Sequence, residues 1–192
     1  MRVITILAAA AVASTPLATP LAAQAPVLNA APSTRATFTL SLSPPRVQGQ
    51  PAPTPLLVTI DYGQPHARGR DVPSELMKDG TVWRTGANAA TTLTTEADLT
   101  IGGAKVPKGA YSLYTIREGG KYVLIINSNT GQWGTDYDAS KDFARVPLRM
   151  RTPSEPIESL QIAMVPPMNG PPKGVLTIGW GRVHLSAEWS AP

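Results

Sequence analysis

The chain has 192 residues, no cysteine, and 17 basic against 13 acidic side chains, which gives a formal charge of +4 at pH 7. Without cysteine there is no disulfide, no thiolate metal site and no lipid attached through sulfur. The small positive charge is spread along the chain without a basic run, which argues against nucleic acid as a partner.

Residues 1–23 have the three parts of a secretory signal peptide. Arg2 precedes an apolar run over residues 3–13, and a stretch of small residues follows at 21–25. The run is about eleven residues long, whereas a membrane-spanning helix needs roughly twenty. Cleavage could follow Ala23 or Ala25, and we favour Ala23 because Pro26 would otherwise lie beside the cut bond. We therefore predict a mature chain without a transmembrane segment and a secreted or periplasmic location.

A flexible tether is predicted at residues 24–35, followed by one domain over 36–192. The tether consists of alanine, proline and small polar residues without periodicity, a composition that buries too little apolar surface to fold. Apolar side chains then alternate with polar ones at Phe38, Leu40 and Leu42, as in a half-buried strand. The length that remains is enough for a single ordinary domain.

Strand signals recur at short intervals along this domain, and a short helix is expected only near residues 74–78. Glycine pairs at 102–103 and 119–120 supply the positive φ angles that tight hairpins require. An α/β fold would need long helices between the strands. We predict an all-β, antiparallel β-sandwich or jelly-roll-like domain. Its strands are expected at residues 37–42, 56–60, 91–95, 99–101, 110–116, 122–127, 146–150, 157–164, 175–180 and 183–189.

No recognised catalytic motif occurs in the sequence: it has no phosphate loop, dinucleotide fingerprint, nucleophile elbow or His-Glu-x-x-His motif. The only two histidines are His66 and His184, so a three-histidine zinc site is impossible. We interpret His184 as a solvent-facing strand residue. We predict neither a metal site nor a cofactor, and the catalytic residues, if the protein has any, stay unknown.

An acidic loop contains Asp136, Asp138 and Asp142, whose spacing is faintly similar to that of a calcium-binding loop. Lys141 stands where such a loop requires glycine, and no glutamate closes it. We interpret these aspartates as caps for backbone amides around Ser140.

Candidate ligand-binding residues gather in two polar segments, 60–70 and 82–91, that follow apolar strands. Charged groups and donors flanked by small residues are typical of sites for carboxylates, phosphates or hydroxyl-rich ligands. Alternatively, a buried Arg84 pairs with Asp61 and only ties a loop to the sheet. An indole between glycines in a third segment is either a stacking platform or a plug at the sheet edge. The candidates are Asp61, His66, Arg68, Arg70, Arg84, Thr85, Asn88 and Trp133.

Four stretches carry a resemblance to a known family: TIDYGQPHARGRDV, DGTVWRTGANAATTL, DLTIGGAKVPKGAYSLYTI and NTGQWGTDY. The chain resembles the bacterial secreted family named domain of unknown function 2911, from about Pro44 to Val146 and more loosely to Trp189. The resemblance implies a signal peptide and a β-rich exported domain, and it implies no activity. Ala89 stands where the family commonly has glutamate, and His66 where it has a small hydroxyl residue. Loss of that glutamate lowers the case for an enzyme.

These observations favour a non-catalytic exported binding or envelope-associated module for a small polar or anionic ligand. One alternative is a hydrolase or lyase with Asp61 or His66 as the base and Arg84 as the electrostatic stabiliser. Another is a purely structural interaction protein. In the binding hypothesis and in its structural alternative, Arg84 and Asp61 are expected to share one hydrogen-bonded cluster, because an isolated charge at the end of an apolar strand is costly. The sequence does not determine the oligomeric state.

Overall fold

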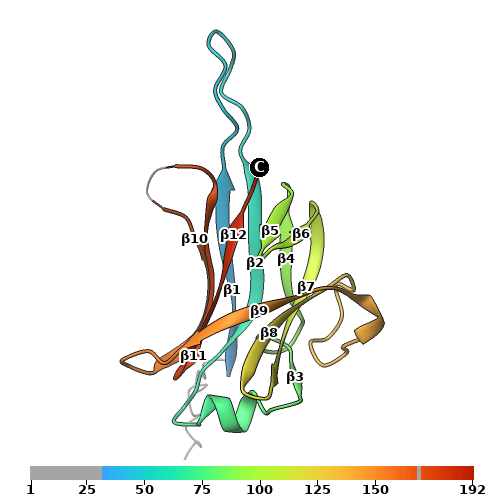
Figure 1. The fold of residues 1–192 in the computed structure, drawn as a ribbon, viewed down its shortest axis with the longest axis vertical. Coiled ribbons are helices and arrows are strands. Elements are labelled where there is room, and N and C mark those ends of the chain that lie inside the picture. The colour runs from blue at the N-terminus through green and yellow to red at the C-terminus, as the bar shows by residue number, and fades with distance from the viewer. Residues whose placement is uncertain (1–31, 168–169) are drawn as a thin grey trace, which may run out of the picture. The chain divides into compact units, whose positions relative to one another are not determined.

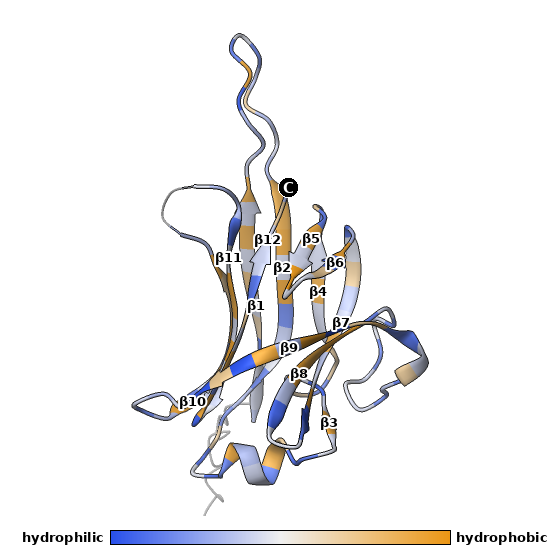
Figure 2. Ribbon diagram, viewed as in Figure 1, coloured by the Kyte–Doolittle hydropathy of each residue, from blue (hydrophilic) through white to orange (hydrophobic). Residues whose placement is uncertain are grey.

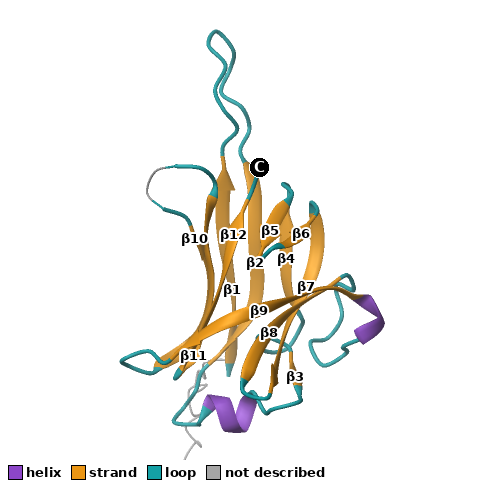
Figure 3. Ribbon diagram, in the orientation of Figure 1, coloured by secondary structure: helices purple, strands orange, loops and turns teal. Residues whose placement is uncertain are grey.

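The computed structural model describes residues 32–167 and 170–192, and these form an all-β domain (Figures 1 and 3). The predicted signal peptide and residues 24–31 of the predicted tether lie outside the described residues. Within the described residues, no helix is long and apolar enough to cross a membrane.

Twelve strands and two short helical segments make up the described chain. The strands are β1 (Ser33–Leu42), β2 (Leu56–Pro65), β3 (Val82–Trp83), β4 (Thr91–Thr95), β5 (Leu99–Ile101), β6 (Ala104–Val106), β7 (Gly109–Glu118), β8 (Lys121–Asn127), β9 (Asp142–Arg151), β10 (Ile157–Val165), β11 (Lys173–Gly181) and β12 (Val183–Ser190). The helical segments are η1 (Val72–Leu76), a π-helical turn, and η2 (Ala139–Lys141), a 3₁₀ turn.

All ten segments that the sequence predicts as strands are strands in the structure. The two that it missed, β3 and β6, have two and three residues, and segments this short carry at most a weak alternating pattern. The glycine pairs at 102–103 and 119–120 all have positive φ, as predicted. One boundary needs correction: β1 begins at Ser33 and pairs with β2 along its whole length, so the last three residues of the predicted tether belong to the sheet.

The strands form a single sheet in which all strand pairs are antiparallel. The lateral order is β1-β2-β4-β7-β8-β9-β12-β11-β10, with β3 on β7 and β5 joining β12 to β6. The two ends of this order approach each other, because Ala67 N–H donates to the Glu158 carbonyl at 2.7 Å. The side-chain amide of Gln64 likewise donates to the Leu160 carbonyl at 2.9 Å.

The sheet is therefore a nearly closed, barrel-like structure, and the predicted sandwich or jelly roll is not confirmed. The all-β, antiparallel class is confirmed. Spacing and alternation fix how many strands there are and which face of each is apolar, and these features are the same in a sandwich and in a curled sheet. The lateral order of the strands is what distinguishes them.

Apolar side chains form a main core cluster and a smaller second cluster, and Figure 2 shows hydrophobic residues along the strands. In β8, Leu124 and Ile126 belong to the main core cluster, while Ile125 between them belongs to a second cluster. Successive strand residues point to opposite faces, so β8 is buried on both. Tyr137, in the loop between β8 and β9, packs against the second cluster and covers it.

Candidate functional site

A groove of about 570 Å³ lies where the end of β2, η1, β3 and the end of β11 meet. Figure 1 shows η1 and β3 at the same end of the sheet. Four of the predicted candidates line the groove together: His66, Arg68, Arg70 and Arg84. No aspartate or glutamate is among the described residues that line it. Its volume is within the range of small-molecule sites.

The turn after β2 places the first three of these side chains. Arg68 has a φ of 52° and Gly69 a φ of 74°, which reverses the chain. Arg70 stabilises the turn by donating from Nε to the Ala67 carbonyl at 3.0 Å and from Nη2 to the His66 carbonyl at 2.8 Å. His66 Nδ1 lies 2.8 Å from Ser159 Oγ on β10. The turn is thereby anchored to both ends of the sheet.

Arg84 is placed by the segment that follows β3. Trp83 ends β3 and stacks on Trp180 of β11, with ring centroids 5.5 Å apart and planes 18° apart. Ala87 N–H then donates to the Gly63 carbonyl at 3.1 Å. A Cβ at Gly63 would lie 1.9 Å from the Ala87 oxygen, so this close crossing requires glycine. The segment is clamped against β2, and Arg84 is held at the groove.

The guanidinium groups of the groove have no acidic partner in the described chain. None of Arg68, Arg70 and Arg84 has a described carboxylate within 4.0 Å of its guanidinium nitrogens. The one described hydrogen bond of the Arg84 side chain is a weak one, at 3.4 Å from Nη1 to the Asn88 carbonyl. The nearest acidic contact is at Arg68, where Glu158 Oε1 accepts the backbone N–H at 2.8 Å. The groove therefore presents uncompensated positive charge, which attracts anions.

Thr85 and Asn88 do not line the groove. The Thr85 side chain is fully buried and shares a hydrogen bond of 2.8 Å with Thr115 Oγ1. Asn88 is exposed, and its carbonyl accepts Gly134 N–H at 2.9 Å. Both residues have positive φ, 49° and 64°. Both residues set the conformation of the backbone that carries Arg84. The polar residues between small ones in the sequence therefore marked a turn here, and not two ligand-binding side chains.

Asp61 is not where the sequence placed it. It lies within β2, and its carboxylate pairs with Arg35 and accepts the Thr37 hydroxyl at 3.0 Å, both from β1. The expected hydrogen-bonded cluster of Asp61 with Arg84 is wrong, because the described side-chain bonds do not join the two. Arg35, assigned to the tether, takes the carboxylate instead. The sequence did not predict this pair, because Arg35 lies in a segment that was not expected to fold.

Comparison with known proteins identifies the family of the chain. The family model described as "Protein of unknown function (DUF2911)" matches residues 43–188. The chain belongs to this family. No curated protein and no solved structure matches it.

The DUF2911 domain also brings residues to the groove that the sequence did not single out. Trp180 and Leu76 line it together with Trp83. Trp83 precedes Arg84 directly, which was the available signal for it. Trp180 follows ninety-seven residues later, on a strand whose order in the sheet is not encoded locally, and nothing in the sequence pointed to it.

Trp133, the remaining candidate, lies beside the segment that carries Arg84 but outside the groove lining. It is 52% exposed, so it does not plug the sheet edge. It bridges to Ala89, and a Cβ at the following Gly134 would come within 2.6 Å of Arg84 Cδ. The loop of Trp133 therefore supports the stem of Arg84 in this DUF2911 protein.

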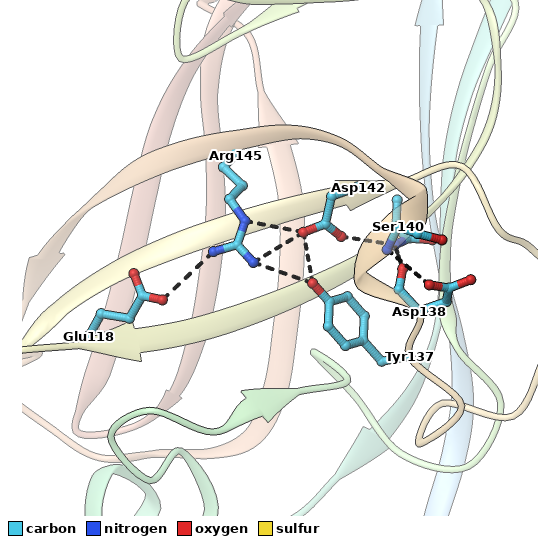
Figure 4. A network of polar contacts seen from close by, with 7 residues as sticks. Glu118, Tyr137, Asp138, Ser140, Asp142 and Arg145 are labelled. Carbon is cyan, nitrogen blue, oxygen red and sulfur yellow. Dashed lines mark hydrogen bonds and ion pairs between the residues drawn. The ribbon is translucent and has the colours of Figure 1, made fainter.

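The acidic loop forms a polar network of its own (Figure 4). Asp138 Oδ1 accepts Ser140 N–H at 2.9 Å, which confirms the predicted capping. The Ser140 hydroxyl and backbone N–H lower the pKa of Asp138. Asp142 accepts from Tyr137 Oη at 2.7 Å and from Arg145 at 3.1 Å. Burial, and then donation to Asp142, raise the pKa of Tyr137.

Metal-ligating side chains do not converge in the described part of the chain: no three His, Asp or Glu residues are placed to hold an ion. His184, predicted to face solvent, is half-buried on β12. Burial and the neighbouring Arg151 lower its pKa. The predicted solvent-facing position therefore needs correction, because β12 is an inner strand and His184 lies between Gly179 of β11 and Arg151 of β9.

Proposed function

We propose that the groove binds a small anionic ligand, a carboxylate or a phosphate, and that the protein acts as a binding module. The observation that carries this is the convergence of His66, Arg68, Arg70 and Arg84 without a described carboxylate to neutralise them. Guanidinium groups with free donors hold carboxylates and phosphates by charge-assisted hydrogen bonds. With the signal peptide predicted from residues 1–23, the ligand would be met outside the cytoplasm.

The arrangement favours binding over hydrolysis or lyase chemistry. Asp61, the carboxylate required as a base, is neutralised by Arg35 on another part of the sheet. His66 Nδ1 contacts a serine hydroxyl, and no described hydrogen bond joins the ring to a carboxylate that would orient it as a base. The site therefore supports a static anion-binding role.

Replacement of Arg84 by alanine tests the proposal. Titration calorimetry of the wild-type protein with inorganic phosphate should give saturable binding. Arg84→Ala should raise the dissociation constant roughly tenfold or more, because one hydrogen bond to a charged group contributes about 1.5–3 kcal/mol. The free energy of unfolding should fall by less than about 1.5 kcal/mol, since Arg84 makes one weak hydrogen bond.

Arg149→Ala is the matched control, because Arg149 is an exposed arginine of β9 that pairs with Glu188 and does not line this groove. This variant should bind phosphate as the wild type does, which separates the groove from a general effect of net charge. Equal phosphate binding by wild type and Arg84→Ala would contradict the proposal. A loss of several kcal/mol in Arg84→Ala would support the structural role of Arg84 instead.

A further inference from the structure

One wall of the groove is aromatic and apolar. Trp83, Trp180 and Leu76 line it, together with Pro65 and Ala87. Trp180 is 2% exposed, while Trp83, stacked on it, is partly exposed and lines the groove. The pair therefore forms a rigid platform whose inner ring is supported and whose outer ring is accessible.

The guanidinium group of Arg84 and the aromatic platform have neighbouring positions in the groove. Arg84 follows Trp83 directly, and their Cα atoms are therefore about 3.8 Å apart. The backbone beyond them is fixed by the crossing over Gly63. Charge and aromatic surface are thus held in a constant relation to each other, which a ligand carrying both features would match.

The size of the groove also favours a ligand larger than an inorganic anion. An inorganic anion has only a few heavy atoms and would leave most of the 570 Å³ to water. Apart from His66, the arginines, Ser33 and Gly86, the residues that line the groove have apolar or aromatic side chains, and contact with such side chains gains free energy only when an apolar group covers them.

We infer that the ligand is an aromatic acid: a flat ring that stacks at Trp83, bearing a carboxylate or phosphate that the groove arginines hold. This inference rests on the proposed function and specifies its ligand class. A ring at this position adds aromatic stacking and apolar burial to the ionic contacts. The ring and the acid are recognised by different side chains, so the two contributions are separable by mutation.

Titration calorimetry with three probes tests the inference: phenyl phosphate, methyl phosphate and inorganic phosphate. Phenyl phosphate should bind wild type with a dissociation constant at least about tenfold below that of methyl phosphate. Trp83→Leu should abolish this advantage and keep the affinity for inorganic phosphate, and Trp83→Phe should keep most of the advantage. Phe143→Leu is the matched control, since Phe143 is an exposed aromatic residue of β9 outside the groove lining, and it should change neither affinity.

The outcomes distinguish the inference from the proposed function. If inorganic phosphate binds through Arg84 but phenyl phosphate binds no better than methyl phosphate, the inference is overturned and the anion site remains. If no probe binds, both are overturned. The comparison of probes on wild type decides the matter even if Trp83→Leu does not fold. Equal loss of inorganic and phenyl phosphate binding in a folded Trp83→Leu would also overturn the ring-stacking role.

Discussion

Arg68, Thr85 and Asn88 are the non-glycine residues with positive φ in the described chain, at 52°, 49° and 64°. For a residue with a Cβ the left-handed conformation costs roughly 1–2 kcal/mol, and a β-branched threonine is a pronounced exception. Such strain persists where the surroundings over-determine it. The crossing at Gly63 and the buried bond of Thr85 to Thr115 fix the segment of Thr85 and Asn88, and Glu158 fixes Arg68 by accepting its backbone N–H. All three residues border the segments that deliver arginines to the groove.

Asn88 is predicted to matter through its backbone. Asn88→Ala should lower the free energy of unfolding by about 1–2 kcal/mol, because alanine tolerates positive φ less well than asparagine. Asn88→Gly is the matched control and should stay within about 0.5 kcal/mol of wild type. Urea unfolding measures both. Equal stability of the two variants, or loss of phosphate binding in Asn88→Gly, would contradict this interpretation.

The candidate residues could be predicted as a group more readily than their roles. Polar side chains between small residues identified both segments, and four of those side chains meet in the groove. The sequence could not separate Arg84, which presents its charge, from Thr85 next to it, which is buried. That difference depends on a left-handed backbone conformation at Thr85, which cannot be predicted from the sequence because threonine rarely adopts it.

Among the elements, the loop between β8 and β9 shows how polar residues stabilise an irregular segment. Asn127 is fully buried, and its side-chain amide donates to the Asp138 carbonyl at 2.8 Å and to Asp142 Oδ1 at 2.9 Å. Arg145 joins Asp142 to Glu118. The loop thereby holds Tyr137 over the outer core cluster. Fixing this loop also fixes Gly134, against which the stem of Arg84 lies.

The cap of η2 should make stability depend on pH. Ser140 lowers the pKa of Asp138 from its ordinary 3.8, so the ionised carboxylate favours the folded state. This contribution is fully present above about pH 3.8 and is lost as the pH falls through the lower, folded-state pKa. Asp138→Ala should be less stable than wild type at pH 7, and the difference should shrink below pH 3.8.

Asp138→Asn is the control for this cap, since asparagine keeps an accepting oxygen without titrating. It should lie between wild type and Asp138→Ala at pH 7 and show a weaker pH dependence than wild type. Urea unfolding of the three proteins from pH 7 down to pH 2.5 makes the comparison. A wild-type advantage over Asp138→Ala that stays constant through this range would refute the ionic contribution.

At the scale of the whole molecule, closure of the sheet creates the site. The groove combines the end of β2 with the end of β11, and His66 reaches Ser159 on β10. Alternation and glycine pairs predicted ten of the twelve described strands and their hairpins, because those signals are local. The curl that brings β2 to β10 depends on contacts between residues about one hundred positions apart, and no local pattern encodes them.

Closure between β2 and β10 is expected to form late in folding, because contacts of high sequence separation carry the largest loop-closure entropy. Tyr62 reports on it: the phenol oxygen accepts the backbone N–H of Ile162 at 3.3 Å, and both residues are buried. Tyr62→Phe leaves that N–H without its acceptor, at a cost of roughly 1–3 kcal/mol. A contact absent from the transition state changes the unfolding rate alone. Stopped-flow measurements should therefore show unfolding accelerated by roughly 5- to 150-fold with folding nearly unchanged.

Leu124→Ala provides the comparison, because Leu124 is a fully buried residue of the β7–β8 hairpin, whose strands are joined by a tight turn. Removing its side chain should cost about 2–5 kcal/mol. If local hairpins form before closure, a substantial part of this cost should appear as slower folding. The opposite result would be that Tyr62→Phe slows folding by as large a fraction of its own loss of stability as Leu124→Ala does. Closure would then precede or accompany hairpin formation. The groove would then be assembled early, with the curled sheet, and not as its last step.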